Sequence, residues 1–82
     1  MMKAVPIPLE KIYVPTRLRG TLDQAKAEAL AEDIVNNGLT TPIQVRVDGA
    51  RFVLVAGLHR LEAVRFLGEK TIAAFTVQAR KA

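Results

Sequence analysis

The spacing of apolar residues changes along this chain, and each change marks a predicted element. Between residues 22 and 35, apolar residues recur every three or four positions, which is the spacing of one face of an α-helix. They are Leu22, Ala27, Leu30, Ala31, Ile34 and Val35. From Ile43 to Val47, apolar residues alternate with Gln44 and Arg46, which is typical of a half-buried strand. The centre of the chain therefore predicts a helix followed by a strand.

Turn and capping residues set the expected limits of this helix. Thr21 and Gln24 have the spacing of a capping box, with Thr21 as the N-cap residue. At the other end, Gly38 suits the left-handed position that follows a helix. We therefore expect the helix to run from the Thr21 cap to about Asn36.

A second strand and a second helix are predicted after the turn dipeptide Asp48-Gly49, which favours a hairpin. Residues 51–56 are apolar after the first position, so this strand is expected to be central and covered on both faces. Residues 59–67 carry a helical stripe of Leu61, Val64 and Leu67, with Ala63 close by and Gly68 as the stop. A last strand is expected over residues 72–77.

The N-terminal part is less regular. Residues 5–9 alternate apolar residues with proline, which allows at best a short edge strand. Residues 10–19 are interpreted as a loop. The resulting order favours an α+β fold, with a small mixed sheet of about four strands, one antiparallel hairpin and two main helices. We interpret residues 1–82 as one domain, with a core over about 5–77 and a basic tail at 78–82.

Length and charge narrow the classes of partner. A chain of 82 residues buries only about 60% of its extended surface, so a homodimer or a larger partner protein would enlarge its core. Twelve Lys and Arg against eight Asp and Glu give a net charge of +4. This excess favours anionic partners such as a nucleotide or DNA. The alternative is a modestly basic protein with no such partner.

Other classes of function are disfavoured by composition. The chain has no cysteine, which excludes disulfides and thiol nucleophiles, and its one histidine argues against a tightly bound transition metal. No apolar run reaches the roughly 20 residues of a membrane span, so we expect a cytoplasmic protein with no membrane partner. Glu28, Glu32, Asp33 and Glu62 are interpreted as solvated or helix-end carboxylates, not as metal ligands or bases.

The candidate chemistry lies where the second predicted strand meets the second predicted helix. The first N–H groups of a helix lack internal acceptors, and the helix dipole places partial positive charge there. Gly57 in the turn lets an anion approach the backbone, and His59 and Arg60 add side-chain donors. An arginine fork matches phosphate in two hydrogen bonds. The segment Gly57–Arg60 therefore predicts a site for phosphate; the alternative is a solvated histidine and a surface arginine beside an ordinary turn.

Several short motifs follow one another at a characteristic spacing. They are Pro6–Leu9 with Pro15, Leu30–Ile34 with Asn37-Gly38-Leu39, Pro42–Arg46, Val55–Arg60 with Ala63, and Leu67-Gly68. In this order, over about Val5 to Val77, they resemble the ParB/sulfiredoxin fold family, specifically the N-terminal domain of ParB-like partition proteins (ParB-like nuclease domain family).

The resemblance implies a nucleoside triphosphate, CTP or ATP and with or without Mg²⁺, whose phosphates lie at Gly57, Leu58, His59 and Arg60. It further implies that basic residues of the preceding loop, matched here by Arg17 and Arg19, lie near the nucleotide. Residues at the entrance of the third predicted element would contact the base. These candidates are Thr41, Pro42, Gln44 and Arg46. The alternatives are solvated loop charges and an exposed sheet face.

Position 58 departs from the resemblance. ParB-like proteins have glutamate there and sulfiredoxins have the reactive cysteine, whereas this chain has Leu58. Leucine can neither attack an electrophile nor transfer a proton, so we assign no catalytic residue and do not expect an enzyme. The sequence is thus interpreted as a ParB-like nucleotide-binding module associated with DNA partition or regulation. The alternatives are a non-specific DNA-binding partition accessory protein, and a small-molecule kinase or nuclease.

Overall fold

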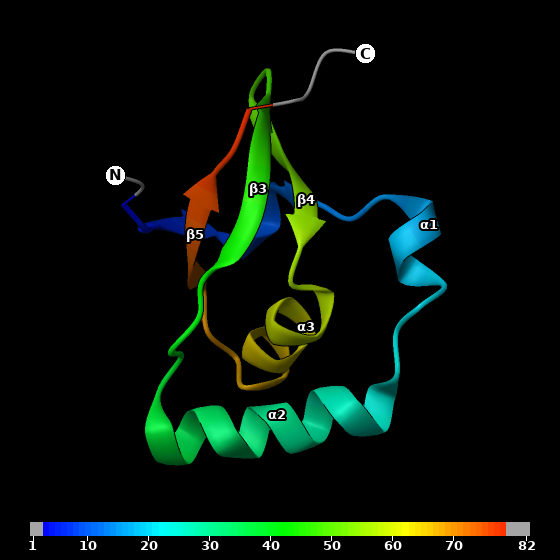
Figure 1. Cartoon of the computed structure of the whole chain (residues 1–82), viewed down its shortest axis with the longest axis vertical. Coiled ribbons are helices and arrows are strands. Elements are labelled where there is room, and N and C mark those ends of the chain that lie inside the picture. The colour runs from blue at the N-terminus through cyan, green and yellow to red at the C-terminus, as the bar shows by residue number, and fades with distance from the viewer. Residues whose placement is uncertain (1–2, 79–82) are drawn as a thin grey trace.

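A five-stranded mixed sheet forms one layer of the computed structural model, which describes residues 3–78 (Figure 1). The strands are β1 (Val5–Pro8), β2 (Ile12–Tyr13), β3 (Ile43–Asp48), β4 (Arg51–Ala56) and β5 (Thr71–Thr76). Their order across the sheet is β1-β5-β3-β4-β2. The pairs β1–β5 and β3–β4 are antiparallel, whereas β3–β5 and β2–β4 are parallel. The expected hairpin is β3–β4, so the predicted α+β class with a mixed sheet is confirmed.

The two longer helices stack below the sheet, whereas the first, short helix lies beside it (Figure 1). The helices are α1 (Thr16–Arg19), α2 (Gln24–Asn37) and α3 (Leu58–Phe66), preceded by the 3₁₀ turn η1 (Leu9–Lys11). Figure 1 shows α3 between the sheet and α2. Within residues 3–78, no helix has the length and apolar character needed to cross a membrane. The two main predicted helices are therefore α2 and α3, and the second begins one residue earlier than expected.

The predicted loop over residues 10–19 is wrong in detail, because it contains part of η1, all of β2 and α1. The extra strand raises the count from four to five. Ile12 and Tyr13 of β2 pair in parallel with Phe52 and Val53 of β4. A strand of two residues has no periodicity of its own, and this pairing depends on residues 40 positions away. Local sequence patterns therefore did not indicate it.

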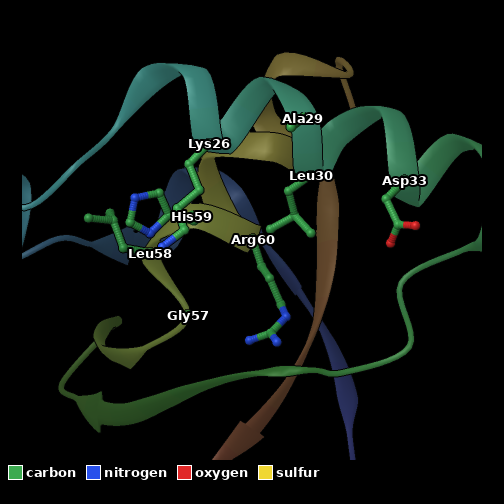
Figure 2. A pocket seen from close by; sticks show the side chains of 8 residues that line it. All are labelled: Lys26, Ala29, Leu30, Asp33, Gly57, Leu58, His59 and Arg60. Atoms are coloured by element: carbon green, nitrogen blue, oxygen red, sulfur yellow. The ribbon is translucent and has the colours of Figure 1, made fainter.

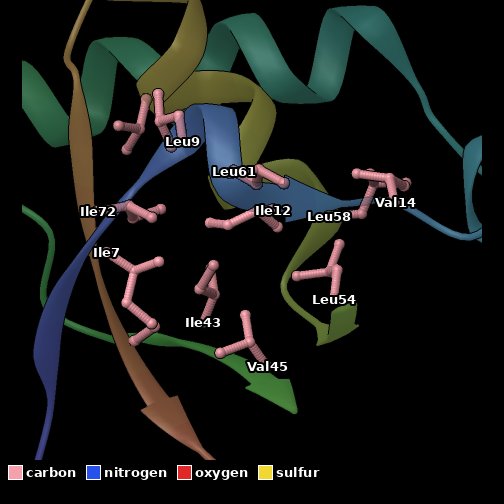
Figure 3. Packing of buried hydrophobic residues seen from close by; sticks show 12 residues of the cluster. Ile7, Leu9, Ile12, Val14, Ile43, Val45, Leu54, Leu58, Leu61 and Ile72 are labelled. Carbon is pink, nitrogen blue, oxygen red and sulfur yellow. The ribbon is translucent and has the colours of Figure 1, made fainter. Parts of the chain in front are cut away.

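The core lies between one face of the sheet and α3 (Figure 3). Ile43, Val45 and Leu54 of the hairpin are at most 1% exposed and pack with Leu61 of α3. The remaining members are Ile7, Leu9, Ile12, Val14, Leu58, Val64, Ile72 and Ala74. Helix α2 packs against α3 and buries Ala27 and Ala31. The first turn of α3 is thus held on one side by the sheet and on the other by α2.

Two expectations about burial are wrong. Val35 was placed on the apolar face of α2, but it is 66% exposed because it lies beyond the stripe that meets α3. Strand β4 does lie inside the sheet, between β3 and β2, and Val53 and Leu54 on its two faces are buried, but this cover does not extend over the whole strand. Val55 and Ala56 at the end of the strand are exposed.

The start of α2 also differs from the expected capping box. The N-cap residue is Asp23, whose Oδ1 accepts a hydrogen bond from the backbone N–H of Lys26 at 3.2 Å. Thr21 instead donates from Oγ1 to the carbonyl of Leu18 at 2.7 Å. The helical turn of α1 extends to Thr21, which is why this residue belongs to the end of α1. At the other end of α2, Gly38 follows the helix as expected, but its φ of 78° and ψ of 169° are not the expected left-handed helical conformation; they lie in a region that glycine almost alone adopts.

Replacing Asp23 with alanine is expected to lower the free energy of unfolding by about 1 kcal/mol, because the N–H of Lys26 loses its acceptor. Thr21→Ala removes an exposed hydroxyl and is the matched control, with an expected loss of under about 0.5 kcal/mol. Urea unfolding of both variants measures the difference. A larger loss of stability for Thr21→Ala than for Asp23→Ala would instead support Thr21 as the N-cap residue of α2.

Candidate anion-binding site at the start of α3

The turn between β4 and α3 leaves the start of the helix without a cap. Gly57 is the N-cap residue and has no side chain to accept a hydrogen bond. The first helical bond runs from the N–H of Leu61 to the carbonyl of Gly57 at 2.9 Å. Within the described residues, the N–H groups of Leu58, His59 and Arg60 have no acceptor. Three amide donors and the positive end of the helix dipole are therefore available to an anion.

Gly57 has a packing role that the sequence did not reveal. Its φ is 105°, a conformation that residues with a side chain rarely adopt. A Cβ added at this position would lie 2.6 Å from Cγ2 and 3.2 Å from Cα of Ile43. The side of Gly57 that lacks a Cβ therefore faces β3 and the core. The glycine lets the turn press against Ile43, which fixes the position of the first turn of α3.

A cavity of about 480 Å³ opens between this turn and α2 (Figure 2). Its volume lies within the range of about 300–1,000 Å³ that is common for small-molecule sites. It is lined by Lys26, Ala29, Leu30 and Asp33 of α2 and by Gly57, Leu58, His59 and Arg60 of α3. The four predicted phosphate-site residues are thus brought together in one cavity. We call it the α2–α3 cavity.

The residues contributed by α2 were missed as site residues. Asp33 was interpreted as a solvated or helix-end carboxylate, Leu30 as part of the apolar face, and Lys26 was not considered as a site residue; Leu30 is only half-buried. The spacing 26, 29, 30 and 33 does place them on one stripe of a helix. The stripe alone did not identify a site, because it becomes part of a cavity only when α3 packs beside it.

The two side-chain donors of the turn lie differently in the α2–α3 cavity. His59 is half-buried, and its Nε2 accepts a hydrogen bond from the backbone N–H of Asp23 at 3.1 Å. Arg60 is also half-buried and extends away from α2, toward the segment that enters β3 (Figure 2). Within residues 3–78, its guanidinium has no hydrogen bond or ion pair. Arg60 is therefore the cation of the turn that is free to bind an anion.

The two arginines before α2 do not line this cavity. Arg17 is exposed on α1. Arg19 donates from Nε to the carbonyl of Val14 at 3.0 Å and lies 5.7 Å from the centre of the Tyr13 ring. It lines a separate hollow of about 470 Å³. The other residues of that hollow are Ile12, Val14, Leu22, Leu58, Glu62 and Arg65.

The candidates for base contacts lie on β3 or just before it. Thr41 and Pro42 precede Ile43, the residue that packs on Gly57, but neither lines the α2–α3 cavity. Gln44 and Arg46 alternate with the buried residues of β3, so they lie on the face of the sheet opposite α3. None of these four side chains therefore lines the α2–α3 cavity.

The carboxylates are dispersed. Asp33 lines the α2–α3 cavity and accepts a hydrogen bond from Nδ2 of Asn37 at 2.9 Å, while Glu62 lies 3.5 Å from Arg65. Glu28 and Glu32 are exposed. Across residues 3–78, no three His, Cys, Asp or Glu side chains gather closely enough to hold a metal ion. Any divalent cation at this site would depend on oxygen ligands from elsewhere.

Comparisons with known sequences and structures identify the family of this chain. The model of the ParB N-terminal domain family matches residues 2–82. The chain belongs to this family. The probable chromosome-partitioning protein ParB of Campylobacter jejuni is 43% identical over 61 residues, which are 74% of this chain and 22% of that protein. The ParB N-terminal domain described here therefore spans only about a fifth of the length of this relative.

Solved structures show the same fold. Sulfiredoxin from Arabidopsis thaliana superimposes with a TM-score of 0.82 and 34% identity, covering 94% of this chain and 86% of that chain. The C-terminally truncated chromosome-partitioning protein ParB from Caulobacter crescentus, complexed with CTP-γ-S, gives a TM-score of 0.81 and 25% identity. That match covers 96% of this chain and 46% of the Caulobacter chain. The expected resemblance to ParB-like proteins and to sulfiredoxins is confirmed.

Leu58 occupies the position at which the resemblance implies a glutamate or a reactive cysteine. Its side chain is 8% exposed and belongs to the hydrophobic core, near Val14 and Leu54 (Figure 3). It lines both the α2–α3 cavity and the hollow that contains Arg19. The apolar side chain of Leu58 therefore separates the α2–α3 cavity from that hollow. The resemblance to sulfiredoxins would place a reactive side chain at this position.

Proposed function

We propose that this ParB N-terminal domain binds a nucleoside triphosphate, CTP or ATP, with its phosphates at the first turn of α3. The observation that carries the proposal is the uncapped start of α3, which opens into a 480 Å³ cavity that Lys26, His59 and Arg60 also line. Free amide donors and cationic side chains at one helix start form a suitable phosphate site.

Each part of the α2–α3 cavity has a role in this proposal. The N–H groups of residues 58–60 donate to phosphate oxygens, and the Arg60 guanidinium binds one phosphate through two donors. Lys26 adds positive charge from the α2 side. Ala29 and Leu30 offer an apolar surface to the base or sugar, and Asp33 accepts a hydrogen bond from a hydroxyl or amino group. A Mg²⁺ ion would be held mainly by phosphate oxygens and water.

The wider role is proposed from the relatives. Similarity to a Campylobacter partition protein, and to a Caulobacter ParB that was solved with CTP-γ-S, supports a nucleotide-binding module that works in DNA partition or regulation. In such a role the domain acts with DNA and with a second copy or a larger protein. Because Leu58 is buried and chemically inert, we propose binding without turnover.

Calorimetric titration with CTP, ATP and GTP, each with Mg²⁺, tests the proposed function. We expect saturable heat with CTP or ATP and a higher melting temperature in its presence, because a ligand that binds only the folded state stabilises it. The absence of heat and of a thermal shift with all three nucleotides would contradict the proposal. Release of phosphate from the nucleotide that depends on Arg60 would instead support an enzyme that hydrolyses or transfers the terminal phosphoryl group, such as a kinase, and cleavage of DNA would support a nuclease.

DNA binding without nucleotide is the alternative that the net charge of +4 favours. In a gel-shift assay, binding that is strong at low salt and lost at high salt with any DNA sequence would support it. We expect nucleotide binding to the α2–α3 cavity to be far less sensitive to salt, because it depends on directed hydrogen bonds as well as on charge.

A further inference from the structure

A side-chain hydrogen bond joins the starts of α2 and α3. The backbone N–H of Asp23, the N-cap residue of α2, donates to Nε2 of His59 at 3.1 Å, although the two residues are 36 positions apart. His59 is the second residue of α3 and lines the α2–α3 cavity. An N–H group can donate only to a ring nitrogen that carries no proton. Nε2 is therefore unprotonated while this bond exists, and the proton of the neutral ring resides on Nδ1.

We propose that the Asp23 backbone N–H holds His59 in the neutral Nδ1–H tautomer, so that the ring offers a single directed N–H donor to an anion in the α2–α3 cavity. The Asp23 amide is thus a positioning group that acts through His59. The identity of the anion rests on the proposed function. In this arrangement Lys26 and Arg60 supply positive charge, whereas His59 supplies one hydrogen-bond donor of fixed orientation.

The charged groups around the ring are consistent with this assignment. The Asp23 carboxylate is turned toward the N–H of Lys26, at 3.2 Å, and serves as the cap of α2. Lys26 and Arg60 line the same cavity, and Asp33 lies further along α2. An imidazolium would carry a proton on Nε2, so it would lose the Asp23 bond and add a third cation beside Lys26 and Arg60. The neutral ring keeps the bond and still provides a donor.

Two substitutions separate the roles of the two ring nitrogens. Asparagine places a polar group near the position of Nδ1, and glutamine places one near the position of Nε2. With tripolyphosphate as the probe, we expect His59→Asn to bind within about threefold of the unmodified chain but to melt a few degrees lower. We expect His59→Gln to melt normally but to bind about tenfold more weakly. His59→Ala should show both losses.

Long-range ¹H–¹⁵N spectra of the imidazole in the unliganded protein, at mildly alkaline pH, provide a readout that a purely structural role would not affect. We expect a protonated Nδ1 and an unprotonated Nε2. Asp23→Ala keeps the backbone N–H and should leave the spectrum unchanged. A predominant Nε2–H tautomer would overturn the inference, as would the reverse order of affinities for His59→Asn and His59→Gln. If the unmodified chain binds neither tripolyphosphate nor nucleotide, the proposed function fails, and the spectrum alone decides whether Asp23 positions the ring.

Discussion

Replacing Arg60 with alanine is expected to weaken nucleotide binding by about tenfold to a hundredfold, the loss that follows from removing charge-assisted hydrogen bonds to phosphate. The guanidinium lines the α2–α3 cavity and has no acceptor within the described residues, so no internal contact competes for it. Because the side chain supports no other part of the fold, stability should change by less than about 0.5 kcal/mol. Calorimetry with CTP and ATP measures the affinity, and urea unfolding measures the stability.

Arg51→Ala is the matched control for this prediction. Arg51 pairs with Asp48 at 3.0 Å and lies 4.4 Å from the centre of the Tyr13 ring, on the hairpin and outside the α2–α3 cavity. This substitution removes the same formal charge but should leave nucleotide affinity within about twofold of the unmodified chain, because exposed charges far from the ligand are screened. Arg60→Lys keeps the charge and loses the fork, so we expect an intermediate affinity. Equal losses for Arg60→Ala and Arg51→Ala would mean that binding depends on net charge alone.

Gly57→Ala is expected to lower the free energy of unfolding by about 3 kcal/mol or more, the sum of a left-handed backbone strain and an overpacked contact. The added Cβ would lie 2.6 Å from Cγ2 and 2.9 Å from Cβ of Ile43, which is among the most buried residues of the core. Relief would require the turn to move away from β3, which would also displace the first turn of α3. We expect nucleotide affinity to fall in the fraction that remains folded.

Gly38→Ala separates the two contributions. Gly38 has φ 78°, but a Cβ at that position would meet no atom within 4 Å. Its expected cost is therefore about 1–3 kcal/mol, from backbone strain alone, because φ 78° with ψ 169° is a conformation that few residues other than glycine adopt. Urea unfolding of the two variants should show the larger loss for Gly57→Ala, because only that variant adds the Ile43 contact. Equal losses of unfolding free energy would show that Ile43 shifts to accommodate the added Cβ and that the turn is not held against β3.

Elements with a long period or a marked turn were predictable from the sequence. Helix α2, helix α3, the β3–β4 hairpin and β5 each span six or more residues with a clear spacing and turn residues at their ends. The short edge strand predicted over residues 5–9 is confirmed as β1, but the segment between β1 and α2 was not predictable, because η1, β2 and α1 are each four residues or fewer and depend on contacts with the rest of the chain. The wrong assignment of Thr21 as the N-cap of α2 also follows from a contact that the local pattern does not show. Thr21 satisfies a local rule, but the end of α1 already uses its hydroxyl.

The candidate site was predictable only where its residues are contiguous. The four residues from Gly57 to Arg60 combine a turn, a helix start and two basic side chains, so one segment carries the whole signal. Lys26 and Asp33 belong to a helix that is 24 or more positions away, and their role depends on the packing of α2 against α3. The hydrogen bond from Asp23 to His59 is likewise a product of that packing. No local sequence pattern indicates which polar stripe of a helix will line a cavity.

The burial of Leu58 limits how this chain could acquire chemistry by substitution. A cysteine at this position is small and apolar enough to occupy the same place in the core, so a thiol could be introduced at modest cost in stability. A glutamate would bring a carboxylate into contact with Val14 and Leu54, where it would have to become neutral or leave the core. Of the two substitutions that would place a reactive group at this position, the one that introduces sulfur is therefore the more accessible.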